Sequence, residues 1–143
     1  MAIRISSALL ARIVGEAGAS PHEVCGLLFG TSASIEAAEP CRNVAADTAT
    51  RFEIDPARLL RAHRAARAGG PQLIGCYHSH PGGEATPSRE DATCAEANGW
   101  LWLIVGGREA QLYRAIEDGV LHGRFSPVAI TRAAFDAPVQ AGA

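Results

Sequence analysis

Pro81 is the residue that most constrains how this chain can fold. It directly follows the apolar segment QLIGCYHSH, residues 72–80, which has the composition of a buried β-strand. Because proline cannot continue a central β-ladder, the strand must end there. His78 and His80 stand one residue apart just before the proline. The sequence therefore predicts that both imidazoles lie at the end of a strand.

Apolar patterns along the rest of the chain predict strands that alternate with about three helices. Helices are expected over residues 7–18 after a cap at Ser6 or Ser7, over residues 56–68 with Asp55 as N-cap, and from Ser88 to about residue 98. Strands are expected at 3–5, 23–30, 34–38, 72–80 and 100–107, with 51–54 as a further candidate. Two more strands are expected around a turn at 117–119, and a strand or short helix at 128–135. This order predicts a single α/β or α+β domain.

The size and composition of the chain agree with one globular domain and exclude several partners. The chain has 143 residues, of which 48% are hydrophobic, so it can bury a substantial core. Its net charge of −2 argues against nucleic acid and membrane surfaces as partners. No segment resembles a signal peptide or a transmembrane span, so we expect a cytoplasmic protein whose four cysteines are free. We expect the domain over residues 1–126 and a partly ordered C-terminal extension over residues 127–143.

His78 and His80 have the spacing of paired metal ligands. Side chains at positions i and i+2 of a strand point to the same face, about 6–7 Å apart along the backbone. Two imidazoles can therefore reach one zinc ion at distances of about 2.0–2.1 Å. Asp91 follows a loop rich in Gly and Pro and would be a third ligand. Such a site leaves a fourth position for water, as catalytic zinc sites do.

Each of these residues also has a structural explanation. A His-x-His pair can occur by chance in a strand. Ser88 and Asp91 have the spacing of a capping box at the start of a helix, which is compatible with metal binding by Asp91. Cys76 shares the predicted face of the two histidines and is a conceivable extra ligand deeper in the strand.

A zinc hydrolase also needs a general base, which is usually a glutamate. The chain contains no HExxH motif and no H-x-E with a later PCxxC, which excludes thermolysin-like proteases and zinc nucleoside deaminases. Glu23 is a candidate, because it opens the apolar segment EVCGLLFG and a carboxylate at the mouth of a buried strand needs a partner or a function. The alternative for Glu23 is a surface position at a strand end.

The pattern His78-x-His80-x7-Ser88-x2-Asp91, with Glu23 at the start of a GLLFG-type strand, resembles the JAMM motif of the MPN+ metalloproteases. The segments PHEVCGLLFG, RNVA, RFEIDP and GCYHSHPGGEATPSRED follow the order of the short bacterial and archaeal members. The resemblance covers roughly residues 3–125. It implies a single MPN/JAMM domain with a curved, mostly antiparallel sheet flanked by helices, similar to cytidine deaminases.

The resemblance also implies the chemistry of the site. It implies one Zn2+ per chain, bound by His78, His80 and Asp91. In this family Glu23 would polarise the water and shuttle its proton, and Ser88 would hydrogen-bond the oxyanion. The implied activity is that of a peptidase or isopeptidase that cuts after the C-terminal Gly-Gly of a ubiquitin-like protein. Bacterial relatives are associated with small sulfur carriers, so such a carrier is the expected substrate.

Two other functions stay open at this point. Many MPN proteins act as scaffolds without protease activity, and the loop PGGEATP resembles that of the DNA-repair-associated RadC proteins. The complete ligand set favours an enzyme, and the near-neutral charge disfavours a role near DNA. The chain is too short for the insertions that grip Lys-linked diubiquitin in some eukaryotic members, which argues against polyubiquitin as substrate. The oligomeric state stays open, with a homodimer as one alternative.

Overall fold

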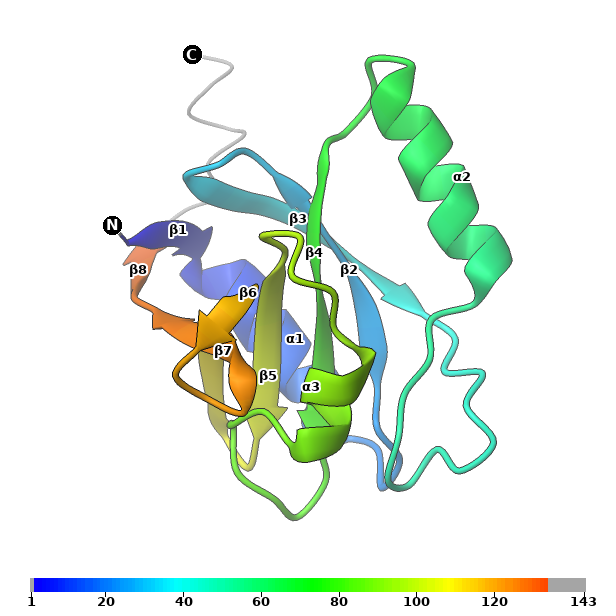
Figure 1. Ribbon diagram of the computed structural model, residues 1–143, viewed down its shortest axis with the longest axis vertical. Helices are drawn as coiled ribbons and strands as arrows, with labels where there is room; N and C mark the ends of the chain where they lie inside the picture. The colour runs from blue at the N-terminus through cyan, green and yellow to red at the C-terminus, as the bar shows by residue number, and fades with distance from the viewer. Residues whose placement is uncertain (1, 134–143) are drawn as a thin grey trace.

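A computed structural model describes residues 2–133, which form one curled, mixed β-sheet with helices packed on both faces (Figure 1). Its helices are α1 (Ser7–Gly18), α2 (Pro56–Arg67) and α3 (Arg89–Cys94). Its strands are β1 (Ile3–Ser6), β2 (Cys25–Gly30), β3 (Ser34–Cys41), β4 (Leu73–His80), β5 (Leu101–Gly106), β6 (Glu109–Gly119), β7 (Gly123–Val128) and β8 (Ile130–Ala133). The order of the strands in the sheet is β7-β6-β5-β4-β2-β3-β1-β8.

The strand pairing confirms the expected α+β fold with a curved, mostly antiparallel sheet. The pairs β2–β3, β2–β4, β5–β6 and β6–β7 are antiparallel. The pairs β4–β5, β1–β3 and β1–β8 are parallel. We expected a C-terminal extension to begin at residue 127, but strand β7 continues through this residue to Val128. Strand β8 then joins the sheet beside β1. Residues 134–143 of that extension lie outside the described residues.

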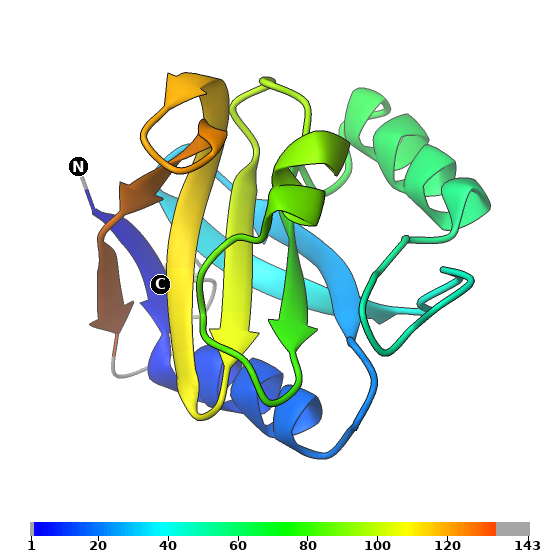
Figure 2. The ribbon, with the colours of Figure 1, turned by 60° about the horizontal axis from the view of Figure 1, so that its bottom comes forward.

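The sheet separates two apolar layers, with α1 on one face and α2 and α3 on the other (Figure 2). On the first face, Ile13 of α1 packs in one buried cluster with Tyr77 of β4 and Leu103 of β5. On the opposite face, α2 packs through Ala62, and the residues around α3 join a cluster built on Trp102 and Phe125. Strand β4 therefore lies in the middle of the sheet with both of its faces covered.

The helix starts follow the predicted capping residues. Ser6 caps α1 by accepting a hydrogen bond from the Leu9 N–H at 3.0 Å. Asp55 caps α2 by accepting from the Ala57 N–H at 3.0 Å, and Pro56 follows at the first helical position. These caps satisfy N–H groups that have no partner inside the helix, which explains why the sequence located both starts correctly.

Three sequence predictions about local structure are wrong. Residues 51–54 form no strand, and Ile54 makes only an isolated bridge to Asn43. Helix α3 ends at Cys94 and not near residue 98, because Ala95 turns to an extended conformation with φ −78° and ψ 137°. The turn between β6 and β7 lies at residues 120–122, because β6 continues through the predicted turn and Gly119 pairs with Gly123.

The sequence predicts no transmembrane span and four free cysteines, and the structure of residues 2–133 bears on both predictions. None of the helices in this part has the length and apolar character that crossing a membrane requires. All four cysteines carry free thiols, and Cys25 and Cys76 are buried.

The glycines of the fold give a paired test of the packing around β4. Gly75 pairs with Leu101 across β4 and β5, and a Cβ at this position would collide with the Leu101 carbonyl oxygen. We predict that Gly75→Ala lowers the free energy of unfolding by about 1–3 kcal/mol. Gly15 is an exposed residue inside α1 with open space around its Cα. Gly15→Ala should therefore raise the free energy of unfolding by about 0.5–1 kcal/mol. Urea denaturation followed by tryptophan fluorescence measures both effects, and equal stability of the two variants would contradict the β4–β5 packing.

Candidate metal centre and active site

Strand β4 delivers two histidines to one point at the end of the sheet. His78 is fully buried, His80 is half-buried, and their Nε2 atoms lie 3.1 Å apart. The Nδ1 atom of His80 lies 3.0 Å from the carbonyl oxygen of Glu84. A carbonyl oxygen only accepts hydrogen bonds, so Nδ1 must donate to it and Nε2 then carries the free lone pair. In the neutral ring this contact leaves Nε2 of His80 unprotonated and aims it at His78.

A fixed loop returns the third donor to the two histidines. Pro81 ends β4, and Gly82 takes a φ of +71° as the chain turns. Farther along the loop, the hydroxyl of Tyr113 donates to the carbonyl oxygen of Ala85 at 2.7 Å. A Cβ at Gly106 would collide with the backbone of the same loop, so this glycine permits the close approach. The loop therefore lies close against the ends of β5 and β6 before α3 begins.

Helix α3 presents Asp91 through a capping box, as its spacing predicts. The Ser88 Oγ atom accepts from the Asp91 N–H at 3.0 Å, and Asp91 Oδ2 accepts from the Ser88 N–H at 2.9 Å. The same Oδ2 atom lies 3.1 Å from Nε2 of His78 and 3.1 Å from Nε2 of His80. The structural and the metal-binding interpretations of Asp91 are therefore compatible in one geometry.

The three donor atoms fit one small cation. Four ligands placed tetrahedrally about 2 Å from an ion lie roughly 3.3 Å apart, close to the 3.1 Å separations between these atoms. Without a cation or a proton, the lone pairs of two imidazoles and a carboxylate would repel one another. Two imidazole nitrogens and a carboxylate oxygen form a common ligand set for zinc. The site therefore agrees with the zinc centre of JAMM proteins.

The protonation states of the cluster also suit a cation. Burial opposes ionisation of Asp91, but in the metal-free protein protonated forms of the neighbouring His78 and His80 rings outweigh it and hold the pKa of this carboxyl below its usual range. Burial likewise lowers the pKa of His78 and keeps its imidazole neutral. Asp91 therefore provides a carboxylate, and His78 a neutral ring, without the loss of a proton at neutral pH.

Glu23 lies beside the cluster just before β2. It is only 7% exposed, and its carboxylate forms a group with the ring nitrogens of His78 and His80 in which all three donor atoms lie within 4.8 Å of one another. Burial is the main influence on this carboxyl and raises its pKa to about 7. A carboxyl group with such a pKa can exchange protons near neutral pH. Glu23 is therefore near the donor atoms without the short contacts that Asp91 makes.

The backbone at Glu23 is held by residues that the sequence did not reveal as part of the site. Asn43 donates from Nδ2 to the carbonyl oxygens of Glu23 at 2.8 Å and Arg51 at 2.9 Å, and its Oδ1 accepts from two backbone N–H groups. The Glu23 N–H donates to the Thr48 carbonyl oxygen at 2.7 Å. Ser79, between the two histidines, accepts from the Val24 N–H at 2.9 Å. The segment RNVA contains Asn43 and was the only signal in the sequence that could have indicated this role.

Aromatic residues enclose the buried histidine. The ring of Phe52 stacks on His78 with 4.2 Å between ring centroids, and Trp102 meets His78 edge-on at 5.6 Å. Cys76 is buried on the same side, and burial raises the pKa of its thiol well above the usual value. A thiol that stays protonated is a poor metal ligand.

Ser88 and the remaining histidines complete the comparison with the sequence predictions. Ser88 is half-buried, and its Oγ accepts the hydrogen bond from Asp91, which leaves its O–H free to donate. His22 is exposed and contacts the hydroxyl of Thr48 at 2.8 Å. His63 has a half-buried ring that stacks on Trp100 with 6.0 Å between centroids.

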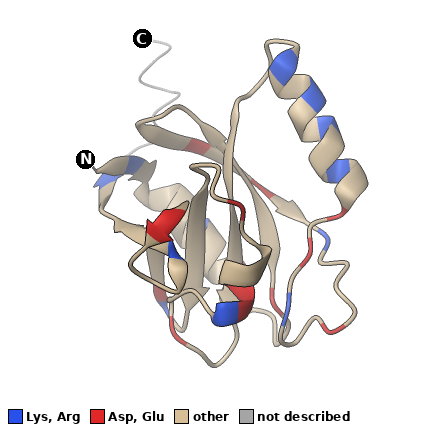
Figure 3. Cartoon of the chain, in the orientation of Figure 1, with Lys and Arg blue, Asp and Glu red and all other residues tan. Residues whose placement is uncertain are grey.

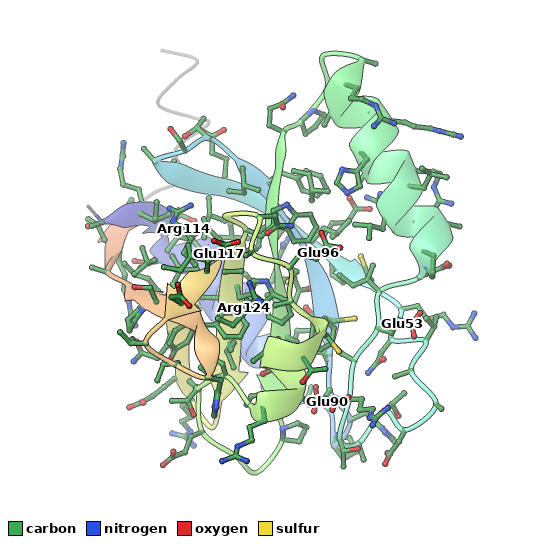
Figure 4. All side chains as sticks on the ribbon, in the orientation of Figure 1. Glu53, Glu90, Glu96, Arg114, Glu117 and Arg124 are labelled. Atoms are coloured by element: carbon green, nitrogen blue, oxygen red, sulfur yellow. The ribbon has the colours of Figure 1, made fainter. Side chains whose placement is uncertain are left out.

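Two grooves each have one residue of the donor cluster in their lining. The first, the α2 groove, has a volume of about 560 Å³ and is lined by the loop over residues 45–54, by Pro56 and Leu59 of α2, by both tryptophans and by Asp91. Glu53 and Glu90 lie on the loop and on α3 at this groove (Figure 4). The second, the α1 groove, has a volume of about 650 Å³ and is lined by residues 17–21, by Val105 and by the end of β4, including His80. The α2 groove therefore offers an extended chain a path to Asp91 of the cluster.

Comparison with known proteins agrees with this geometry. Residues 6–117 match the Prok-JAB family, described as prokaryotic homologs of the JAB domain. A desampylase from Haloferax volcanii is 39% identical over 92 residues, which are 63% of this chain and 66% of that protein. A probable TtuB-protein conjugate cleaving protease from Thermus thermophilus is 39% identical over 72 residues, 50% of this chain and 48% of that protein. The matches thus span about two thirds and about half of these relatives.

A solved structure shows the same fold over nearly the whole chain. The solution structure of protein DSY2949 from Desulfitobacterium hafniense superposes with a TM-score of 0.78 at 25% identity, and covers 95% of this chain and 96% of that chain. The family match includes all five residues of the predicted motif. The chain therefore belongs to the Prok-JAB family, the prokaryotic branch of the JAMM-type domains.

Proposed function

We propose that this protein is a zinc-dependent peptidase or isopeptidase that cuts after the C-terminal Gly-Gly of a ubiquitin-like protein, with a small sulfur carrier as the substrate. The observation that carries the proposal is the convergence of His78, His80 and Asp91 within 3.1 Å of one another, with the carboxylate of Glu23 beside them. The names of the relatives, a desampylase and a conjugate-cleaving protease, support this class of substrate. The complete donor set disfavours a zinc-free scaffold.

The contacts distinguish the roles of the two carboxylates. Asp91 Oδ2 lies 3.1 Å from both histidine nitrogens, whereas the carboxylate of Glu23 lies within 4.8 Å of them and makes no hydrogen bond to either ring among the described residues. The pKa of Asp91 is low, which suits a ligand, and the pKa of Glu23 is raised to about 7, which suits a proton carrier. We therefore assign His78, His80 and Asp91 as the residues that hold zinc, and Glu23 as the general base.

The residues of the chain then share the work of hydrolysis. When bound, zinc supplies Lewis acidity, which makes water nucleophilic at neutral pH and polarises a carbonyl group. Glu23 accepts the proton of the attacking water and delivers it to the leaving nitrogen as the C–N bond breaks. The free O–H of Ser88 donates to the carbonyl oxygen as negative charge develops on it. Asn43 and Ser79 keep Glu23 in place through the backbone contacts described above.

The shape of the site suits an extended tail without large side chains. The α2 groove reaches Asp91 of the donor cluster, so it can hold the substrate tail beside the scissile bond. A tail that lies along exposed backbone gains hydrogen bonds without requiring particular side chains. Glycine at the scissile position lets the substrate backbone approach Ser88 and the donor atoms, where a Cβ would obstruct it.

Two substitutions should separate metal binding from chemistry. Glu23→Gln keeps the size and polarity of the side chain but removes its ability to accept a proton. We predict that this variant retains one zinc per chain while turnover falls by about two to four orders of magnitude. Asp91→Ala should lose stoichiometric zinc, because it removes a ligand. Metal analysis of purified proteins and rate measurements test both statements. Loss of zinc in Glu23→Gln with retention in Asp91→Ala would exchange the two roles.

The substrate assignment can be tested with defined carriers. Zinc-loaded enzyme is incubated with ubiquitin-like sulfur carriers from the same genome, extended beyond Gly-Gly by one residue or by a peptide. We predict a cut directly after the second glycine, detected by mass spectrometry, and no cut when that glycine is replaced by valine. Unrelated peptides serve as the control. Equal cleavage of those peptides, or no cleavage of any Gly-Gly carrier, would contradict the assignment and leave a zinc hydrolase with another target.

A further inference from the structure

Helix α2 carries a concentration of positive charge that the catalytic site does not use. Four of the 13 basic residues of the chain lie within its 12 residues, which contain no Asp or Glu. Figure 3 shows this as blue bands along α2 without a red one. The rest of the chain holds nine arginines against 15 acidic residues, so the positive charge of α2 stands out on an otherwise acidic protein.

The internal contacts of α2 account for one of its arginines. Arg58 forms an ion pair with Glu39 of β3. Arg61, Arg64 and Arg67 are exposed and have no ion-pair partner among residues 2–133. Arg64 and Arg67 lie in the last turn, where their positive charges interact favourably with the helix dipole. This interaction does not account for Arg61, which lies outside the last turn.

An exposed leucine lies among these arginines. Leu60 is 47% exposed, one of two large hydrophobic side chains that are exposed in the described part of the chain. Arg64 and Arg67 follow it at i+4 and i+7, so the three side chains share one side of the helix. We call Leu60, Arg61, Arg64 and Arg67 the α2 outer face. An apolar side chain ringed by arginines is typical of protein interfaces, in which Arg is enriched.

The α2 outer face adjoins the groove that leads to the donor cluster. Leu59 lines the α2 groove, and the ring of His63, one turn farther along the helix, stacks on Trp100 of the same groove. Arg67 follows His63 by four residues and therefore lies next to it one turn on. Asp91 lines the groove at its other end. An extended substrate tail of about six residues is roughly 20 Å long. Helix α2, with its 12 residues, is about 18 Å long, so the tail and the helix have comparable lengths.

We propose that the α2 outer face docks the folded body of the ubiquitin-like substrate through acidic residues that surround an apolar patch on that body. The proposal rests on the proposed function, because the tail of the same molecule would occupy the α2 groove. Charge complementarity requires an acidic partner surface. Protein is favoured over nucleic acid because the exposed apolar side chain of Leu60 lies among the arginines.

The test compares a whole carrier with its tail alone. The two substrates are an acidic Gly-Gly sulfur carrier with a short C-terminal extension, and a synthetic peptide with only its last six residues and the same extension. The charge-reversal variant is Arg64→Glu with Arg67→Glu. The matched control is Arg4→Glu with Arg132→Glu, which reverses the charge of two exposed arginines on the paired strands β1 and β8. Arg64→Lys with Arg67→Lys keeps the charge.

We expect the α2 charge reversal to raise KM for the whole carrier at least tenfold and to leave kcat unchanged. Hydrolysis of the peptide should change less than twofold, and the control pair and the lysine pair should behave like the wild type within threefold. The wild-type KM for the carrier should rise with salt, and the charge reversal should flatten that dependence. An unchanged KM for the carrier, or equal losses on carrier and peptide, would overturn the proposal.

Further measurements test whether a molecule other than the substrate binds the α2 outer face, and whether the proposed function itself fails. A change in oligomeric state on charge reversal, measured by analytical ultracentrifugation, would assign the face to a second copy of the chain. Loss of binding to a fluorescent single-stranded oligonucleotide, with an unchanged KM for the carrier, would assign it to nucleic acid. Both results overturn the proposal. If the wild type cleaves neither substrate, the proposed function fails, and fluorescence anisotropy with labelled carrier still decides whether the α2 outer face binds it.

Discussion

The mutual approach of three electron-rich atoms is the constraint on which the rest of the structure depends. Two imidazole nitrogens and a carboxylate oxygen lie 3.1 Å from one another in a largely buried position, an arrangement that a cation stabilises. His78 has no exposed surface and Asp91 is 5% exposed, so solvent cannot relieve their repulsion. The fold must therefore hold these atoms against an unfavourable interaction whenever neither an ion nor a proton lies between them. This explains why each donor comes from a rigid element or is fixed by a hydrogen bond to the backbone.

The sheet order and a few polar contacts provide that rigidity. The central strand β4 positions both histidines, Pro81 ends the strand at the required point, and the capping box of α3 fixes Asp91 at the first turn of a short helix. The loop over residues 43–54 connects the remaining parts, because Asn43 binds the backbone of Glu23 while Phe52 stacks on His78. The proposed base, the proposed ligands and the groove walls are thus connected through this loop, and a change in it would affect the position of Glu23 and the packing of His78 together.

Much of this arrangement follows from local sequence signals, and the rest depends on contacts between distant segments. The alternation of His78 and His80 before Pro81, the capping box of Ser88 and Asp91, and the cap and proline of α2 are short-range patterns with direct physical causes, and the structure has all of them. The turn at residues 120–122 could not be located, because Glu117, Asp118 and Gly119 have turn composition but lie in an irregular stretch of β6, in which Gly119 alone of the three pairs with β7. The role of Asn43 was equally hidden, because its partners Glu23 and Arg51 lie 20 and 8 residues away and no periodicity links them.

The most direct test of this account is the position and coordination of the metal. A crystal structure of the zinc-loaded protein, with anomalous diffraction recorded at the zinc absorption edge, would locate the ion independently of activity. The account predicts a single strong peak bonded to Nε2 of His78, Nε2 of His80 and a carboxylate oxygen of Asp91, with Glu23 near the ion but outside its bonding distance. A peak bonded to Glu23 in place of Asp91, a bond to the thiolate of Cys76, or the absence of any peak between the two histidines would contradict it.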